Sequence, residues 1–379
     1  MPSFEILHSS NQGRVGRIIT DHGVVDTPNF IFCATKGSVR GLGPWDLSRL
    51  GVQIILSNTY HMMIYPGAEM VKSAKGVHGI SGWNGPMFTD SGGYQVFALG
   101  HGSVSNELKG KRCTNPTVKQ INEEGVVFQS YREGNIVHLT PEKSIQMQID
   151  MGADLIVNFD ECTPFHITYE QTRAAMERTN RWQDRGLEYF QKHSNGSQGL
   201  YAVVQGSIYP DLRTTSMQYC SERDYFGYGI GGSLGQNLSD MHKVLEVFQK
   251  YKKPERPVHL LGMGGFIKEI FEALPYGIDT FDCVHPTRVA RHGLAMGRTK
   301  IDIRRHTTSQ EPLDRDCPCM TCSHYSRAAL HILYRAGELT ALVALAEHNV
   351  ATMVRLMSDI RIGLANDSLQ DVRKYWCGG

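Results

Sequence analysis

The chain has 379 residues, of which 41% are hydrophobic and 20% charged, and its formal net charge is +1. This composition is typical of a globular protein, and the near-zero charge excludes nucleic-acid binding through bulk charge, so such a role needs a local basic patch. No apolar run is long enough to span a membrane and no secretion signal opens the sequence, from which we expect a cytoplasmic protein.

After a small antiparallel entry at residues 3–27, apolar segments alternate with helical patterns. The eight predicted strands are Phe30–Cys33, Ile54–Ser57, Met87–Asp90, Leu155–Phe159, Tyr201–Val204, Phe226–Ile230, Val258–Leu261 and Ile278–Val284. The predicted helices between them include Pro141–Met151, Glu170–Lys192, Pro210–Cys220, Asp240–Tyr251 and Ile267–Leu274. Short apolar strands alternating with helices indicate a parallel sheet, and eight strands close it into a ring. The predicted fold class is therefore α/β, a (β/α)8 TIM barrel.

The segment Gly100–Thr140 interrupts this alternation after the third strand. It is polar, rich in lysine over Lys109–Lys119, and its second half predicts a hairpin of Val126–Ser130 and Ile136–Thr140. We interpret it as an insertion at the carboxyl end of a strand, either a surface ornament or a flap over a substrate.

Three cysteines lie close together in a proline-containing loop, with the spacing C-x-C-x2-C: Cys317, Cys319 and Cys322. The chain has 9 cysteines, an odd number, which favours a reducing compartment and a metal site over a disulfide framework. Zinc takes four tetrahedral ligands, usually thiolate and imidazole, so we expect one structural Zn2+ ion per chain with a fourth ligand from another segment. The candidates for that ligand are His348, His324 and His331.

The chain divides into three predicted parts. Residues 1–300 form the barrel with its insertion at 100–140, and residues 301–349 form an inserted zinc-binding subdomain. Residues 350–379 contribute a C-terminal helix that completes the barrel. The apolar stripe of the helix predicted at Leu342–Ile360 excludes His348, which leaves that side chain free to face the subdomain.

Polar residues and glycines recur where the predicted strands end. In chain order they are Asp90 with Ser91, Gly92 and Gly93, then Asp160, Gln205, Gly231 and Gly232, Gly262 to Gly265, and Asp282. In a barrel the carboxyl ends of the strands meet at one mouth, so we expect these residues to surround one site. Each of them alone has a simpler interpretation, as a helix cap, a turn residue or an ordinary loop glycine. Their recurrence favours the site.

This set of residue types suits chemistry at the anomeric carbon of a sugar. One carboxylate attacks the carbon, and a second one moves the proton to or from the leaving group. A third carboxylate, with an amide and backbone N–H groups, suits a flat heterocycle that has both donors and acceptors. Tyr94 is placed to stack on such a ring.

Five motifs together resemble the tRNA-guanine transglycosylase family, in the family's order and over nearly the whole chain. They are Phe88–Phe97, Phe159–Pro164, Val204–Ser207, Phe281–Arg288 and the cysteine cluster with His348. The Phe-Asp-Glu-Cys sequence is most similar to the bacterial branch. The resemblance implies a zinc-containing barrel, usually a homodimer, that binds the tRNA anticodon loop. It would exchange guanine at the wobble position of GUN-anticodon tRNAs for a 7-deazaguanine, through a covalent tRNA–enzyme intermediate.

By motif, the resemblance implies that Asp282 is the nucleophile on ribose C1′ and Asp90 the general acid/base. The base would be bound by Asp160, Gln205, Gly232, Tyr94 and Leu261, with Ser91, Gly92, Gly93, Cys162 and Gly231 around it. RNA contacts would come from Gly262, Met263, Gly264, Gly265, Phe266, Ile267 and Lys268, and from the turn of Thr287, Arg288, Val289, Ala290 and Arg291. The zinc ligands would be Cys317, Cys319, Cys322 and His348.

The chain departs from the bacterial pattern beside the pocket for the 7-substituent. Bacterial members usually carry Gly-Gly-Leu-Ala followed by a glutamate. This chain instead has Gly231-Gly-Ser-Leu-Gly, which is similar to the sequence of chlamydial relatives, and then Gln236 where the glutamate is expected. A carboxylate there favours the aminomethyl base preQ1, so its loss leads to the hypothesis that the pocket takes the larger base queuine.

Two other classes of function are open to this sequence. A catalytically silent, zinc-containing RNA-binding subunit of the same fold does not need the two carboxylates, whereas Asp90 and Asp282 are both present. A metal-dependent barrel hydrolase needs histidine ligands at strand ends, and His61, His259 and His285 do not form that pattern.

Overall fold

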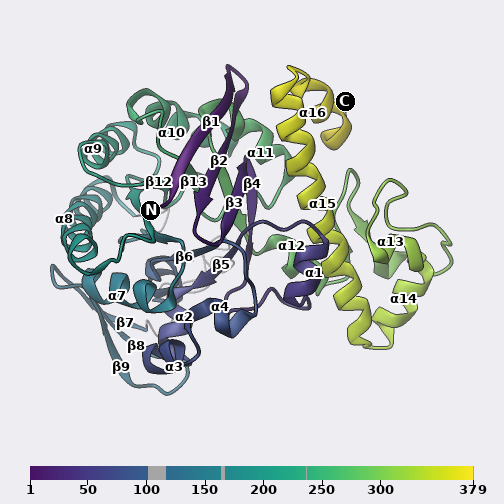
Figure 1. The fold of residues 1–379 in the computed structure, drawn as a ribbon, viewed down its shortest axis with the longest axis horizontal. Helices are drawn as coiled ribbons and strands as arrows, with labels where there is room; N and C mark the ends of the chain where they lie inside the picture. The colour runs from purple at the N-terminus through teal and green to yellow at the C-terminus, as the bar shows by residue number, and fades with distance from the viewer. Residues whose placement is uncertain (101–116, 164–166, 236, 379) are drawn as a thin grey trace.

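The computed structural model describes residues 1–100, 117–163, 167–235 and 237–378, and its centre is a closed barrel (Figure 1). In chain order the barrel strands are β4 (Asn29–Cys33), β5 (Ile55–Asn58), β6 (Met87–Asp90), β10 (Leu155–Val157), β11 (Gly199–Val204), β12 (Gly227–Ile230), β13 (Val258–Leu260) and β14 (Thr280–Cys283). Each strand pairs with the next in parallel, and β14 pairs with β4 to close the ring. The predicted (β/α)8 fold class is confirmed.

An antiparallel sheet at the N-terminus covers the amino ends of the barrel strands. It consists of β1 (Ser3–Ser10), β2 (Gly13–Thr20) and β3 (Gly23–Thr27). Ile18 of β2 and Val25 of β3 are fully buried and join the apolar cluster that fills the barrel, with Ile54, Phe88 and Tyr201 among its members. The alternation of apolar and polar residues in β2 therefore places one face of this sheet against the barrel interior.

A buried ion pair fastens this sheet to the barrel. The Arg14 Nε donates to Asp279 Oδ1 at 2.8 Å, and its guanidinium also donates to the carbonyl oxygens of Pro254 and Arg256. Asp279 Oδ2 in turn accepts a hydrogen bond from the Val258 amide at 2.7 Å. Both charges are removed from water, so their pairing is required for either to be tolerated.

Helices surround the ring. They are α1 (Pro44–Arg49), α2 (Thr59–Ile64), α3 (Ala68–Ser73), α4 (Gly76–Ser81), α5 (Gly93–Gly100), α7 (Pro141–Met151), α8 (Tyr169–His193), α9 (Pro210–Ser221), α10 (Leu238–Tyr251), α11 (Ile267–Ala273) and α12 (His285–Ala290). Helix α7 begins where predicted because Thr140 caps it and Pro141 opens its first turn. The turn predicted at Thr287–Arg291 is wrong, since these residues fall in and directly after α12, which begins at His285 with Pro286 in its first turn.

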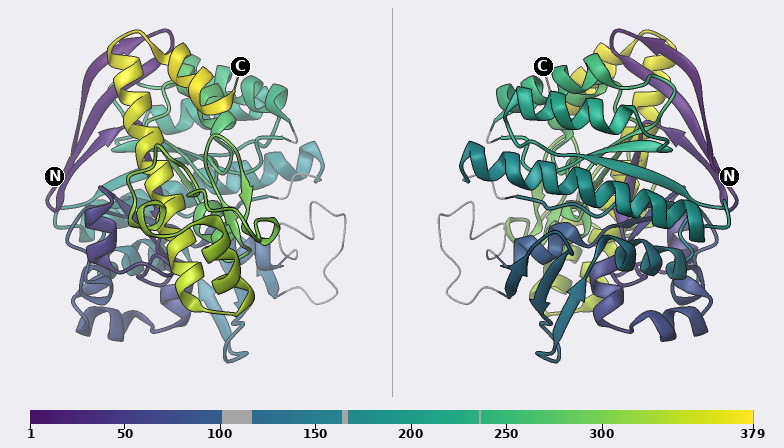
Figure 2. Two further views of the ribbon diagram at one scale, coloured as in Figure 1. Left: turned by 90° about the vertical axis from the view of Figure 1, so that its right-hand side faces the viewer. Right: turned by 90° about the vertical axis from the view of Figure 1, so that its left-hand side faces the viewer.

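The segment inserted after β6 ends in a small antiparallel sheet. The hairpin predicted there is present as β8 (Val126–Gln129) and β9 (Ile136–Leu139), and β7 (Val118–Ile121) adds a third strand. Residues 101–116 lie outside the described residues. The sheet projects on the side of the molecule away from the N-terminal sheet (Figure 2). Phe128 of this sheet and Trp182 of α8 belong to one buried apolar cluster, and the Phe128 ring centroid lies 5.4 Å from that of Tyr60, so the sheet belongs to the rim of the barrel's carboxyl end.

The C-terminal part contains the hairpin β15 (Leu294–Ala295) and β16 (Ile301–Asp302), followed by α13 (Met320–His324), α14 (Arg327–Arg335), α15 (Leu339–Ala365) and α16 (Leu369–Cys377). Helix α15 lies between the barrel and the segment that holds α13 and α14 (Figure 1). The boundary predicted between the zinc-binding subdomain and the C-terminal helix, at residues 349 and 350, falls inside this continuous helix. Asn349 on α15 donates to the carbonyl oxygens of Pro286 and Leu294, at 2.9 and 3.1 Å, and thereby holds α12.

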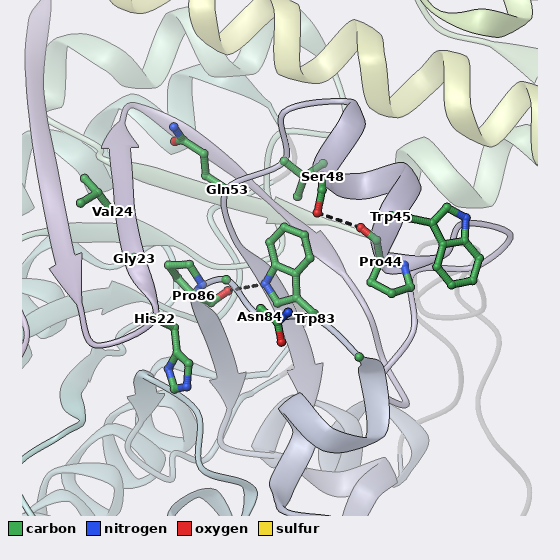
Figure 3. A pocket seen from close by; sticks show the side chains of 13 residues that line it. His22, Gly23, Val24, Pro44, Trp45, Ser48, Gln53, Trp83, Asn84 and Pro86 are labelled. Atoms are coloured by element: carbon green, nitrogen blue, oxygen red, sulfur yellow. Dashed lines mark hydrogen bonds between the residues drawn. The ribbon is translucent and has the colours of Figure 1, made fainter.

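A surface hollow of about 540 Å³ lies at the opposite end from the strand ends described below (Figure 3). Trp83 closes its floor, its indole N–H bonded to the Pro86 carbonyl at 3.1 Å, and the exposed Trp45 stands at its edge. Its lining contains one titratable side chain, His22, so the hollow lacks a pair of acid and base groups. Within the described ranges, no helix is both long and apolar enough to cross a membrane.

Candidate active site

Asp90 ends β6 and is held by donors from β5, α2, the turn after β6 and α5. Its Oδ1 accepts hydrogen bonds from the backbone amides of Thr59, at 3.0 Å, and Gly92, at 3.1 Å. Its Oδ2 accepts from the Asn58 side-chain amide and from Gln95 Nε2 at 3.3 Å. Asn58 is the cross-strand partner of Asp90 in the β5–β6 pair, so strand register brings them together. The carboxyl group is therefore fixed in one orientation.

Burial raises the pKa of Asp90 to about 7, and the negative charge of Asp282 acts in the same direction against the donors. A carboxyl with this pKa exists in both protonation states near neutral pH, as a general acid/base requires. Burial and the same two carboxylates raise the pKa of the Cys33 thiol well above its ordinary value, so it stays protonated. Asp90 and Asp282 thus share one electrostatic environment.

Asp282 lies in β14, the last barrel strand. Its Oδ1 accepts a hydrogen bond from the Gly262 amide at 2.7 Å and lies 3.2 Å from Nε2 of His259. Its Oδ2 lies 3.8 Å from the Cys33 thiol. The side chain keeps 13% of its surface exposed, so the carboxylate is accessible from the mouth of the barrel.

Asp160 forms a second, more deeply buried carboxylate site. Its Oδ2 accepts from Gln205 Nε2 at 2.6 Å, and its Oδ1 accepts from the Ser91 hydroxyl at 3.1 Å. Burial raises the pKa of Asp160 to about 6, while these two hydrogen bonds lower it. A Cβ on Gly93 would lie 2.6 Å from the Asp160 carbonyl oxygen, so only glycine fits there.

Gln205 is enclosed by a glycine pair and a buried arginine. A Cβ on Gly232, whose φ is +71°, would lie 2.4 Å from Gln205 Oε1. Beneath it, Arg213 Nε donates to the Ser207 carbonyl at 2.8 Å, and its guanidinium also donates to the Val204 and Ser233 carbonyls. Burial lowers the pKa of Arg213 to about 9. The guanidinium joins the loops after β11 and β12.

The other residues predicted for base binding border the same mouth. Tyr94 is 48% exposed at the start of α5, and Leu261 packs against the interior cluster while its amide bonds to the Ile230 carbonyl at 3.3 Å. Cys162 is partly exposed. Gln236 and Pro164 lie outside the described residues.

The predicted RNA-contacting residues divide into buried and accessible ones. Buried members are Gly264, Gly265, Thr287, Val289 and Ala290, whereas Gly262, Phe266, Lys268 and Arg288 are exposed and Met263, Ile267 and Arg291 are partly so. Burial lowers the pKa of Arg291, and so do the positive charges of Arg40 and Arg288. These three arginines therefore form a basic patch, and the sequence had indicated two of them.

Cys317, Cys319, Cys322 and His348 converge, as predicted, with one ligand atom each within 4.8 Å of the others. His348 Nδ1 lies 3.2 Å from Cys322 Sγ and 3.7 Å from Cys319 Sγ. Its Nε2 lies 2.9 Å from the Met296 carbonyl oxygen, to which only a protonated nitrogen can donate, so Nδ1 presents a lone pair to the sulfurs. The four residues can hold a metal ion.

The rival histidines are used elsewhere. His324 and His331 contact backbone carbonyl oxygens at 2.9 and 3.0 Å. A second group, His22, His78 and Asp154, is also compact, but its atoms are already paired. His22 Nδ1 lies 2.8 Å from Asp154 Oδ1, and His78 Nε2 lies 3.1 Å from the Gly85 carbonyl. This group stabilises the amino end of the barrel.

Sequence reasoning missed several residues of the site. Asn58, Thr59 and Gln95 hold Asp90, and Cys33 and His259 lie against Asp282. Cys33 ends the first predicted strand and Asn58 directly follows the second, so the strand-end pattern of the later strands also marks these two residues. Nothing in the local sequence marks His259, which lies inside an apolar strand.

The fold and the site define a class: a (β/α)8-barrel enzyme with three carboxylates at its carboxyl-terminal mouth and a separate metal-binding cluster. A family model described as queuine tRNA-ribosyltransferase matches residues 9–378. The chain belongs to the queuine tRNA-ribosyltransferase family and is thus a transferase of tRNA processing.

Relatives with that name are similar over nearly their full length. The one from Protochlamydia amoebophila is 42% identical over 371 residues, which cover 96% of this chain and 95% of the relative. The one from Roseiflexus sp. is 39% identical, with coverage of 97% and 96%. The one from Chlamydia muridarum is 40% identical, with coverage of 97% and 99%.

Proposed function

We propose that this chain replaces guanine at the wobble position of GUN-anticodon tRNAs by a 7-deazaguanine, preQ1 or queuine, in queuosine biosynthesis or salvage. The observation that carries the proposal is a pair of carboxylates, Asp90 of β6 and Asp282 of β14. They interact electrostatically at the mouth of a barrel that belongs to the queuine tRNA-ribosyltransferase family. Exchange without net hydrolysis needs such a pair, because one group must hold the sugar while the other exchanges protons with the bases.

In the first half-reaction, a carboxylate oxygen of Asp282 attacks ribose C1′. The bond between C1′ and N9 of guanine breaks, the electron pair goes to N9, and Asp90 donates the proton that N9 receives. In the second half-reaction, Asp90 takes the N9 proton of the incoming base, N9 attacks C1′, and the ester bond to Asp282 breaks. The raised pKa of Asp90, about 7, suits a group that must be an acid and then a base.

Base recognition falls to the buried carboxylate site. Asp160 accepts from the amino and ring N–H groups of the base, while Gln205 and the Gly232 amide donate to its carbonyl oxygen. The hydrogen bond from Gln205 to Asp160, at 2.6 Å, supports a preorganised site of this kind. Tyr94 and Leu261 border the two faces of the ring.

The basic patch of Arg40, Arg288 and Arg291, with the exposed Lys268, provides the contacts to the anticodon loop. Arginine suits this role because it binds phosphate and base edges through several donors. The expected assembly is a homodimer, and the expected location is the cytoplasm.

The cysteine cluster would hold a zinc ion. Three thiolates and one imidazole complete a tetrahedron, and the orientation of His348 through Met296 fits this donor set. These four residues would supply all the ligands of such an ion, so its contribution would be structural. The cluster connects α13 to α15, and α15 holds α12, which follows the strand of Asp282.

The experiment is the exchange of radiolabelled guanine into tRNA by the purified chain. We expect Asp282→Asn to abolish exchange and to yield no denaturation-resistant tRNA–enzyme adduct, whereas the wild type yields one. Asp21→Asn, in the exposed turn after β2, is the matched control and retains both. A folded wild-type chain that binds tRNA without exchange or adduct would instead support the silent RNA-binding subunit.

A competition assay decides between the incoming bases. The loop from Gly231 to Gln236 has an amide where bacterial members usually have a glutamate, so we expect queuine to be incorporated more efficiently than preQ1. Gln236→Glu should shift the preference toward preQ1. Efficient incorporation of preQ1 with no use of queuine would contradict this assignment.

A further inference from the structure

His259 is a polar ring inside the apolar interior of the barrel. It lies in the middle of β13 and is fully buried, with its ring centroid 4.6 Å from that of Phe88. The transfer of an imidazole into such a place is costly unless its two nitrogens find partners. The contacts of those nitrogens therefore indicate its role.

The Nδ1 atom of His259 is 2.9 Å from the Thr280 hydroxyl, its cross-strand partner in the β13–β14 pair. When that hydroxyl donates, the imidazole proton lies on Nε2. Nε2 is 3.2 Å from Asp282 Oδ1, although the ring direction departs from hydrogen-bond geometry, and it has no other partner among the described residues. The one nitrogen of this buried ring that has no hydrogen-bond partner in the part of the chain that the structure describes thus lies beside the catalytic carboxylate.

The two oxygens of Asp282 have different surroundings. Oδ1 accepts from the Gly262 amide at 2.7 Å and faces His259 Nε2. Oδ2 faces the Cys33 thiol at 3.8 Å, which is a weak donor at a long distance. A carboxylate held at one oxygen presents the other one as the free nucleophile.

We propose that His259 is a positioning residue for Asp282, and this inference rests on the proposed exchange reaction. Its Nε2–H, together with the Gly262 amide, holds Oδ1 and leaves Oδ2 to form the bond to ribose C1′. Thr280 sets the tautomer that makes Nε2 the donor. The arrangement is built from β13, the turn that follows it and β14, and the register of the two strands places His259 beside Thr280.

The two half-reactions depend on Oδ1 of Asp282 in different ways. In the covalent intermediate Oδ1 becomes the ester carbonyl oxygen, and it still accepts from both donors. When the incoming base attacks C1′, the electron pair of the C1′–Oδ2 bond returns to Asp282, and negative charge spreads onto Oδ1. Donors on Oδ1 stabilise that charge, so loss of one slows breakdown of the adduct more than its formation.

The test compares His259→Leu, which keeps similar volume without a donor, with His259→Gln, whose side-chain amide nitrogen can reach the position of Nε2. Each full-length variant is mixed with radiolabelled tRNA, and the adduct is chased with excess guanine and counted on denaturing gels. We expect adduct decay to slow about tenfold or more in His259→Leu, so that adduct accumulates, and to recover to within about threefold in His259→Gln. Thr280→Val should show a smaller slowing of the same kind.

Other outcomes overturn the assignment. Equal slowing of formation and decay in both His259 variants means that the ring only fills space. Unchanged rates in His259→Leu mean that Asp282 is positioned without it. If the wild type forms no adduct, the proposed exchange reaction itself fails, and that result is distinct from both of these.

Discussion

Asn58 donates a hydrogen bond to Asp90, and replacing Asn58 tests the acid/base step directly. Asn58→Asp keeps the size of the side chain and still caps α2, because the oxygen that accepts from the His61 amide at 3.0 Å is retained. The variant replaces the amide donor toward Asp90 Oδ2 with a carboxylate oxygen. The variant therefore changes the electrostatics of Asp90 while it keeps the cap of α2.

The expected magnitude follows from that single bond. A hydrogen bond to a charged acceptor contributes about 1.5–3 kcal/mol, and about 1.4 kcal/mol corresponds to one pH unit. Loss of the donor disfavours ionised Asp90, and the added carboxylate acts in the same direction. Because the first half-reaction needs protonated Asp90, activity falls as pH rises through its pKa, which is about 7 in the wild type. The falling limb of the pH–activity profile should move to higher pH by about one to two units in the variant.

The measurement is the pH profile of kcat/KM for tRNA in guanine exchange, with the Asp21→Asn variant as the control for a change of surface charge. At high pH the Asn58→Asp variant should keep a larger fraction of its own maximal kcat/KM than the wild type keeps of its maximum. A falling limb that stays in place, or moves to lower pH, would refute the assignment of Asp90 as the proton donor.

Three further predictions concern the supports of the site. Arg14→Met leaves the Asp279 carboxylate buried without its partner, so the free energy of unfolding in urea should fall by about 3–5 kcal/mol; an unchanged urea midpoint would contradict this. Gly93→Ala forces a methyl toward the base-binding aspartate and should raise KM for the incoming base about tenfold, and equal KM values would exclude the close approach. Cys322→Ser should lower bound zinc, measured by elemental analysis, and reduce Tm by roughly 5 °C, whereas Cys377→Ser, on the exposed cysteine of α16, should change neither.

Local patterns were enough to locate the barrel strands and the ends that carry the site. A buried strand of three to six residues stands out as a short apolar run in a single sequence, and a carboxylate or glycine pair at its end is visible without a structure. Asp90, Asp160 and Asp282 were found in this way. The helix α12 was missed because the basic residues after Pro286 resemble a polar turn, and burial against α15 was not visible.

The choice among three histidines for the cysteine cluster shows the limit of this reasoning. Residue spacing alone left His324, His331 and His348 open, and family resemblance was needed to select His348. In the structure, α15 presents His348 to the cysteines, while the other two bond to nearby backbone carbonyls. The decision therefore depended on how a helix distant in sequence packs.

The sequence by itself determined which residue types stand at the barrel mouth, since strand period, turns and strand-end carboxylates are properties of neighbouring residues. Only the tertiary structure decided how those groups are held, because Asn58 meets Asp90, and His259 meets Thr280, through the register of adjacent strands. Register is set by the closure of the whole ring, to which all eight strands contribute, and no local stretch of sequence contains that information.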